Sequence, residues 1–505
     1  MIEEDRIESL ELDLDLIKQR SATGIASFLM RMVFLQAVTF VTSIFVSRFL
    51  NPYAFGVYGI VSNFVFLFVF FSDIGLAAAL VQKKEKLTKD DLKTTFTIQQ
   101  TLILIIVIII IVALPFIQPV LKFDDDGLWL GRALAVSLLL ASLKSIPSVL
   151  LERKLKFNLL VVPEIAETVV FNGVLVILAA SGWGVKSFAL AVLSRGFVGL
   201  ITIYILQPWR IGIGFNRQVA SKLVRFGAPF QLNSILAWFK DSLLDNVVAL
   251  ILHSPTSFGY LSWARNLSYQ PKKVMDSVIK VTFPVYSRLQ DKRDILANAL
   301  SKTYFLLAVT MFPIMAGICI LVRQFIMYLY GGDKWLPAVP AVYFLTLTLV
   351  WGLFNSVAIN VISSIGKIKT VLKFMVMVTV ATWLLTPLFT YKWGFDGAAL
   401  SYVLSGFVSI WSINKATKEV KIDFIRDMKG AFISTLVMSM VIYFLGNWWI
   451  HNLIQLVITI LIGALIYGIT LYILEKERLF KEVSSILGKQ VTFTVLMPKF
   501  IRVRI

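Results

Sequence analysis

The sequence predicts an all-α polytopic membrane protein with 14 transmembrane helices: two pseudo-symmetric six-helix lobes around a central cavity, plus two C-terminal helices. Three observations predict this fold: apolar runs of membrane-spanning length, basic residues that alternate between successive loops, and an internal repeat. Composition agrees, because 58% of the 505 residues are hydrophobic and 16% are charged. A soluble protein is about half apolar and a quarter charged.

Apolar runs of roughly 20 or more residues recur along the chain, and each is long enough to cross the roughly 30 Å hydrocarbon core of a bilayer. Proline and glycine inside several runs do not exclude a helix, since membrane helices tolerate them. We expect spans at 24–49, 54–81, 94–121, 128–150, 158–180, 184–207, 224–251, 256–288, 302–329, 337–364, 370–391, 395–414, 430–449 and 453–474.

Basic residues alternate between the expected loops, and this alternation supports both the number of spans and their orientation. Intervening loops carry at most one lysine or arginine each. The positive-inside rule places the basic loops, and with them both termini, in the cytoplasm. This distribution also explains the net charge of +19 without a nucleic-acid partner. The basic loops lie at 83–93, 153–156, 210–225, 288–293, 367–373 and 415–429.

An internal repeat divides the expected helices into two groups of six. The pattern P-x-x-F-G occurs at 52–56 and again at 255–259, and a Trp-Gly pair occurs at 183–184 and 393–394. Six is an even number, so both groups insert the same way up, as parallel repeats do. The expected domains are a cytoplasmic arm (1–23), an N-lobe (24–215), a C-lobe (216–420), helices thirteen and fourteen (421–474) and a basic cytoplasmic tail (475–505).

The eighth expected span, 256–288, carries more charge than a lipid-facing helix tolerates. Arg265, Lys272, Asp276 and Lys280 are spaced so that they share one face of a helix. Each charge at the centre of a bilayer costs at least about 2.5–3.5 kcal/mol, so this face must contact water or protein. We interpret it as the lining of a positively charged, water-filled cavity between the lobes.

Other charges inside the expected spans extend this interpretation. Salt bridges inside the bundle are an alternative to cavity lining, and Arg31 could instead reach an interface from near the end of its span. The candidate substrate-binding residues are Lys240, Arg265, Lys272, Lys273, Lys280, Arg195 and Arg31.

Acidic residues in the same spans are candidates for ion coupling. Asp241 and Asp245 lie one turn apart, as do Glu164 and Glu167. Two carboxylates this close in a low dielectric suit a proton or sodium site. Neutralisation of nearby cations is the alternative, and the sequence leaves both open. Asp73 and Asp276 occupy equivalent repeat positions and are candidates for a gate or for helix capping.

No enzymatic signature or cofactor site is expected. A single cysteine, Cys319, and two isolated histidines, His253 and His451, exclude a Cys/His metal centre. The phosphate-binding pattern G-x-x-x-x-G-K-[ST] does not occur, which excludes an ATP motor of that type. We therefore expect a transporter without a cofactor.

Six stretches carry a family resemblance: RFLNPYAFGVYG (48–59), FSDIGLAAALVQKKE (71–85), LLERKLKFNLLVVPEIA (150–166), FGAPFQLNSIL (226–236), WARNLSYQP (263–271) and YGGDKWLPAVPAVYFL (330–345). They resemble the Wzx-type polysaccharide flippases and exporters of the multidrug/oligosaccharidyl-lipid/polysaccharide superfamily. The closer similarity is to the branch of colanic-acid and teichuronic-acid exporters.

The resemblance implies flipping of a polyprenyl-pyrophosphate-linked oligosaccharide across a bacterial or archaeal cytoplasmic membrane by alternating access, driven by an ion. It implies membrane lipids, and polysaccharide polymerase or assembly proteins, as further candidate partners. The residues agree with it, because arginine and lysine in a wet cavity can offset the lost hydration of a pyrophosphate.

Competing functions within the superfamily remain open. A lipid II flippase would have a similarly cationic cavity, whereas a multidrug or cation antiporter would favour an acidic one. A membrane glycosyltransferase or polymerase would need a larger outer loop with a carboxylate cluster than any loop expected here.

Overall fold

The computed structural model describes residues 34–69, 75–83, 85–420 and 423–487, although for 226–242 and 481–487 it describes only the helical backbone. These residues form helices joined by short connections, with no strand among them, so the predicted all-α class is confirmed. Within the described ranges, 10 helices are long and apolar enough to cross a membrane. Two shorter apolar helices, Phe34–Phe49 and Leu243–Leu252, accompany them.

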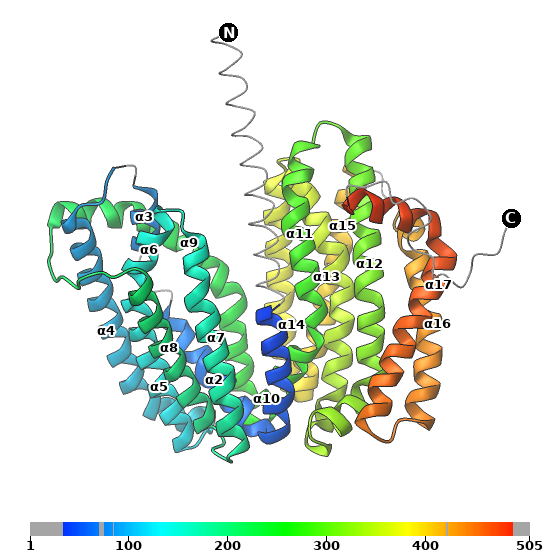
Figure 1. Ribbon diagram of the computed structural model, residues 1–505, viewed down its shortest axis with the longest axis horizontal. Coiled ribbons are helices and arrows are strands. Elements are labelled where there is room, and N and C mark those ends of the chain that lie inside the picture. The colour runs from blue at the N-terminus through cyan, green and yellow to red at the C-terminus, as the bar shows by residue number, and fades with distance from the viewer. Residues whose placement is uncertain (1–33, 70–74, 84, 421–422, 488–505) are drawn as a thin grey trace, which may run out of the picture. The chain divides into compact units, whose positions relative to one another are not determined.

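The chain divides into two compact units, Met1–Asn246 and Val247–Ile505. In unit 1, α8 packs against α7 and α5, and α5 also contacts α4 and α2, so these helices form one bundle (Figure 1). The helices of unit 1 are α2 (Pro52–Val69), α3 (Leu76–Gln82), α4 (Lys89–Leu121), α5 (Asp125–Leu143), α6 (Ser145–Arg153), α7 (Phe157–Ala180), α8 (Lys186–Leu206) and most of α9 (Arg217–Leu252).

In unit 2, α12 is the central helix, with contacts to α11, α13, α16 and α17. Buried apolar side chains from these helices, among them Leu300, Met311 and Val357, form its core. The helices of unit 2 are α10 (Pro255–Ser268), α11 (Gln270–Arg288), α12 (Arg293–Gln324), a π-helical turn (Phe325–Leu329), a 3-10 turn (Asp333–Ala338), α13 (Val339–Ser364), α14 (Ile368–Gly406), α15 (Ser409–Glu419), α16 (Phe424–Trp448) and α17 (Leu453–Leu487).

Two expected spans are interrupted at residues close to prolines. The span expected at 128–150 is divided into α5 and α6 at Lys144, and the span expected at 256–288 is divided into α10 and α11 at Tyr269. Pro147 and Pro271 each lack the amide hydrogen that a continuous helix would use. The hydroxyl of Tyr204 in α8 donates to the carbonyl of Leu143, the last residue of α5, at 3.2 Å. Pro147, four residues further on, has no amide hydrogen to donate to that carbonyl.

The chain reverses direction inside the element labelled α14. Trp393 and Gly394 have non-helical backbone angles, and Gly394 takes a φ of 61° that favours glycine. The hydroxyls of Thr386 and Ser401 lie 2.8 Å apart, whereas residues 15 positions apart in a straight helix would be about 22 Å apart. The Trp-Gly turn thus separates the spans expected at 370–391 and 395–414.

The last helix, α17, bends at Glu475, and the segment after the bend is fixed to α12 and α16 by one ion pair. Arg478 donates to the buried carboxylate of Asp427 at 2.9 Å and to the Ser301 hydroxyl at 2.8 Å. Its guanidinium also lies 4.3 Å from the ring centre of Phe305. Gly430 of α16 allows Glu475, at the bend of α17, to lie against α16. A Cβ at position 430 would lie 2.2 Å from a Glu475 carboxylate oxygen.

We expect Arg478→Ala to destabilise the protein, because it leaves Asp427 buried without its cation. Breaking a buried pair costs roughly 3–5 kcal/mol, and the cost here should be smaller because the Arg478 side chain is 22% exposed. Thermal unfolding of the purified protein in detergent measures the effect. The neighbouring exposed arginine provides the matched control, Arg426→Ala, which should leave the midpoint unchanged. Equal midpoints for both variants would contradict this assignment.

Candidate functional site

The single charged face expected on the eighth span is divided by the break at Tyr269, so that Arg265 lies on α10 and the other charges lie on α11. On α11 they lie away from the side that packs in unit 2. Pro271, Met275 and Tyr286 are the buried residues of α11, and the helix contacts α12 and α13. The charged side chains instead lie on exposed residues. These are Lys272, Lys273, Asp276 and Lys280.

The lysines of α11 are not neutralised inside unit 2. The ammonium of Lys273 donates to the side chain of Gln270 at 3.3 Å, and that of Lys272 lies 5.7 Å from the ring centre of Tyr269. Among the residues that the structure describes, no carboxylate lies within ion-pair distance of Lys272, Lys273 or Lys280, including Asp276 one turn beyond Lys272. Salt bridges within this face, one of the two alternatives, are therefore not formed there.

Arg265 precedes the break, at the end of α10, and its guanidinium is oriented by an aromatic residue of α14. It is half-buried, and Nη2 lies 3.2 Å from the hydroxyl of Tyr402. The carbon of the guanidinium is also 5.6 Å from the centre of the Tyr402 ring. These two contacts limit the movement of the side chain.

A second charged cluster lies inside unit 1, where Glu167 of α7 is buried between two cations. Its carboxylate bonds to the ammonium of Lys144 at the junction of α5 and α6. Arg195 of α8 donates to the other carboxylate oxygen at 3.3 Å, and its side chain is 54% exposed. The cluster therefore carries a net charge of +1, and the exposed part belongs to Arg195.

Gly199 allows the carboxylate of Glu167 to lie against α8. A Cβ at this position would come within 1.9 Å of a Glu167 carboxylate oxygen. Gly199 follows Arg195 by one helical turn, so the glycine and the arginine face the same carboxylate. Of the two alternatives for Glu167, the contacts in unit 1 match neutralisation of cations rather than pairing with Glu164.

The other candidate residues are exposed, half-buried or without a described side chain. Glu164 is exposed on α7, and Asp245 is half-buried in α9. Lys240 and Asp241 also lie in α9, but their side chains are not described. Arg31 and Asp73 fall outside the described residues.

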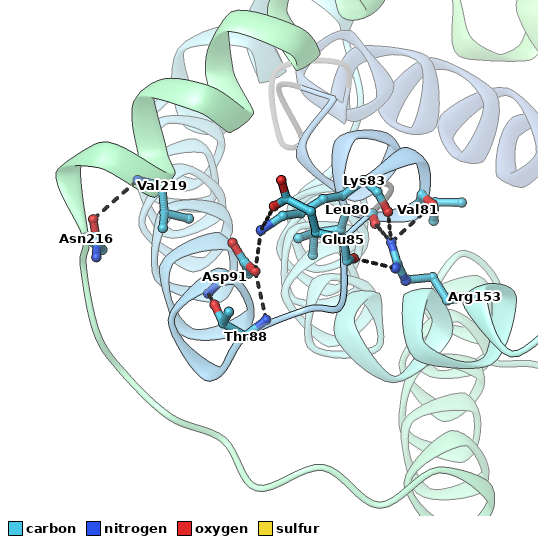
Figure 2. A network of polar contacts seen from close by, with 9 residues as sticks. All are labelled: Leu80, Val81, Lys83, Glu85, Thr88, Asp91, Arg153, Asn216 and Val219. Atoms are coloured by element: carbon cyan, nitrogen blue, oxygen red, sulfur yellow. Dashed lines mark hydrogen bonds and ion pairs between the residues drawn. The ribbon is translucent and has the colours of Figure 1, made fainter.

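Sequence reasoning missed a polar network that joins α3, α4 and α6, shown in Figure 2. Arg153 donates to the carbonyls of Leu80 and Glu85 at 2.7 and 2.8 Å, so it holds the end of α3 and the following loop. Lys83 pairs with Asp91 at 2.7 Å, and Asp91 forms a reciprocal capping box with Thr88. The capping box was readable from the T-x-x-D spacing, whereas the contacts of Arg153 were not.

A half-buried acid with one buried carboxylate oxygen was also missed. Asp396 of α14 lies just after the Trp-Gly turn, and its Oδ1 is buried without a hydrogen-bond partner in the part of the chain that the structure describes. In the sequence, Asp396 could have been noticed because it is the one charged residue inside the span expected at 395–414.

Comparison with known proteins identifies the family. The model of the polysaccharide biosynthesis protein family matches residues 45–340, which is more than half of the chain. The chain belongs to this family. The predicted similarity to Wzx-type polysaccharide flippases is thereby confirmed.

Two curated relatives support this assignment. A membrane protein in the cps region of Klebsiella pneumoniae is 25% identical over 467 residues, which cover 87% of this chain and 92% of the relative. The lipopolysaccharide biosynthesis protein WzxC of Escherichia coli is 24% identical over 331 residues, or 64% of this chain and 65% of WzxC.

Among solved structures, the lipid II flippase MurJ in an inward closed conformation has the same fold. Its TM-score is 0.71 at 18% identity, and the match covers 90% of this chain and 99% of MurJ. The protein is therefore a multi-pass membrane protein of a polysaccharide flippase family with a MurJ-like helical fold.

We expect Gly199→Ala to destabilise unit 1, because the added methyl group cannot fit beside Glu167 without displacing its carboxylate from Lys144 and Arg195. The matched control is Gly173→Ala in α7, where a Cβ meets no atom within 4 Å. The control should be neutral or stabilising by about 0.5–1 kcal/mol, because alanine favours helix. Thermal unfolding in detergent compares the two variants. If both behave alike, Gly199 has no special packing role.

Proposed function

We propose that this protein flips a polyprenyl-pyrophosphate-linked oligosaccharide across the cytoplasmic membrane, and that the substrate's pyrophosphate and any acidic sugars pass along the cationic surface of α10 and α11. The observation that carries the proposal is that Lys272, Lys273 and Lys280 are exposed, with no carboxylate at ion-pair distance among the described residues. A membrane protein keeps such a surface only if water or an anionic ligand faces it.

The chemistry of the surface fits a phosphate-bearing ligand. Arg265 offers a planar fork, which matches two phosphate oxygens, and Tyr402 holds this fork in one orientation. The lysines provide point charges on flexible stems, which can follow a ligand as it moves. A binding surface for cationic drugs would instead need carboxylates, and Asp276 is the single acid on α11.

The proposal includes 14 membrane spans, with both termini in the cytoplasm. The 10 long apolar helices and two short ones do not include α10 and α11, whose charges lower their hydropathy. Counting that charged pair, and treating α14 and α15 as two spans divided at the Trp-Gly turn, brings the number to 14. The charge of the loops supports the orientation.

The proposal includes ion coupling through α9. Both carboxylate oxygens of Glu167 already contact cations, Oε1 the ammonium of Lys144 and Oε2 the guanidinium of Arg195. Asp241 and Asp245 of α9 are the remaining pair, and we propose them as the site of coupling. Proton flux measured in vesicles with Asp241→Asn and Asp245→Asn separates this role from a purely structural one.

Replacing the cations should stop transport. We expect the double variant Arg265→Ala and Lys272→Ala to reduce export of lipid-linked glycan by about tenfold or more, since each charged hydrogen bond contributes roughly 1.5–3 kcal/mol. Export is measured in cells at matched expression, and flipping of a fluorescent lipid-linked oligosaccharide is measured in vesicles. The exposed lysine of α14 provides the control, Lys373→Ala, which should export normally.

Full export by the double variant would remove these residues from the mechanism. The vesicle assay also separates the two substrates that a cationic cavity can accept. Flipping of lipid II, but not of the polysaccharide precursor, would assign the protein to peptidoglycan synthesis and overturn the proposed substrate.

A further inference from the structure

The connection between α8 and α9 is an extended segment that lies along the beginning of α4, all within unit 1. The amide of Gly214 donates to the hydroxyl of Thr97 at 3.1 Å, and the amide of Asn216 donates to that of Thr94 at 3.1 Å. Trp209 fixes the start of the segment, with its ring 5.0 Å from that of Phe96. The segment is therefore held in one position on α4.

Alternation of glycine with large apolar residues gives this segment two different faces. Gly212 and Gly214 face α4, since a Cβ on Gly212 would lie 2.8 Å from a carbon of the Lys93 side chain. The side chains between and beside them point away, as in any extended chain. Ile211, Ile213 and Phe215 are 56%, 82% and 66% exposed. We call these three residues the apolar strip.

The position of the apolar strip corresponds to the edge of a membrane. Thr94 and Thr97 lie between the charged first turn of α4 and the apolar part of that helix, which is among the candidate spans. The segment itself follows α8, another candidate span, whose last turn exposes Ile205 at 73%. The apolar part of α4 and the apolar end of α8 therefore both give way to charged residues where the strip lies.

Exposed cations precede and follow the strip along the chain and also lie at the start of α4, where Asp90 is an exposed acid next to Lys89. An apolar surface with a basic border matches the acyl boundary and phosphates of an anionic leaflet. A soluble partner would leave Ile205 and the apolar side of α4 unexplained. The exposed cations are Lys89, Lys93, Arg210, Arg217, Lys222 and Arg225.

We infer that the apolar strip inserts into the headgroup region of an anionic membrane leaflet, and that Arg210 and Arg217 at its two ends bind lipid phosphates. The strip then fixes the level of unit 1 in the bilayer at the connection between α8 and α9. This role does not depend on the substrate that the protein transports.

Fluorescence quenching of the full-length protein in nanodiscs tests the inference. Cys319 is the single native cysteine, so Cys319→Ser provides a background for one label at Ile213→Cys. Lys86→Cys, on an exposed residue of the loop before α4, provides the matched control. The quenchers are phosphatidylcholine with brominated acyl chains, with or without added phosphatidylglycerol, and aqueous iodide.

We expect lipid bromine to quench the label at position 213 severalfold more than the control label, and iodide to do the reverse. Phosphatidylglycerol should strengthen lipid quenching at 213, and Arg210→Gln with Arg217→Gln should remove that increase. Equal iodide quenching at both positions would place the strip in water and overturn the inference. Protection of position 213 from both quenchers would mean that protein covers it, which also overturns it, and insensitivity to phosphatidylglycerol would overturn the role of the two arginines.

Discussion

The cost of an unpaired charge in a low dielectric is the constraint on which this structure depends. A buried carboxylate needs a cation or several hydrogen bonds, because the penalty for removing it from water is otherwise several kcal/mol. Two clusters meet this need by pairing a buried carboxylate with cations. Glu167 lies between Lys144 and Arg195 inside unit 1, and Asp427 pairs with Arg478 inside unit 2. Both clusters join helices, so the charges that had to be neutralised also fix the packing.

The lysines of α11 differ from these clusters, because no carboxylate lies at ion-pair distance from them among the described residues. Asp427 and Glu167 each have a cationic partner from a neighbouring helix. Lys272, Lys273 and Lys280 are exposed on a helix whose opposite face is packed in the core of unit 2. Stability of unit 2 does not require these charges. The proposed passage of an anionic substrate would give these charges a role, and it is consistent with the polysaccharide flippase family to which the chain belongs.

Sequence reasoning was most successful where the information is local. The exposed face of α11 follows from residues three and four positions apart, and the reversal at Trp393 follows from a Trp-Gly pair between two apolar runs. The breaks at Lys144 and Tyr269 could have been expected from the prolines that follow them. Ion pairs between helices could not, because Lys144 and Glu167 are 23 residues apart and Arg478 and Asp427 are 51 apart. Helical spacing predicts which residues of one helix lie side by side, but it does not predict which faces of two different helices pack together.

The same distinction explains why charge inside a span is an ambiguous signal of function. Arg195 and Lys272 were both candidates for substrate binding on one criterion, a cation within an apolar run. Arg195 has a carboxylate at 3.3 Å and Lys272 has an aromatic ring. A cation paired with a buried carboxylate can bind a phosphate only by weakening that pair, so Arg195 would exchange one anion for another. Lys272 has no carboxylate at ion-pair distance among the described residues, and this supports the proposal that a pyrophosphate would pass along α11 rather than at Arg195.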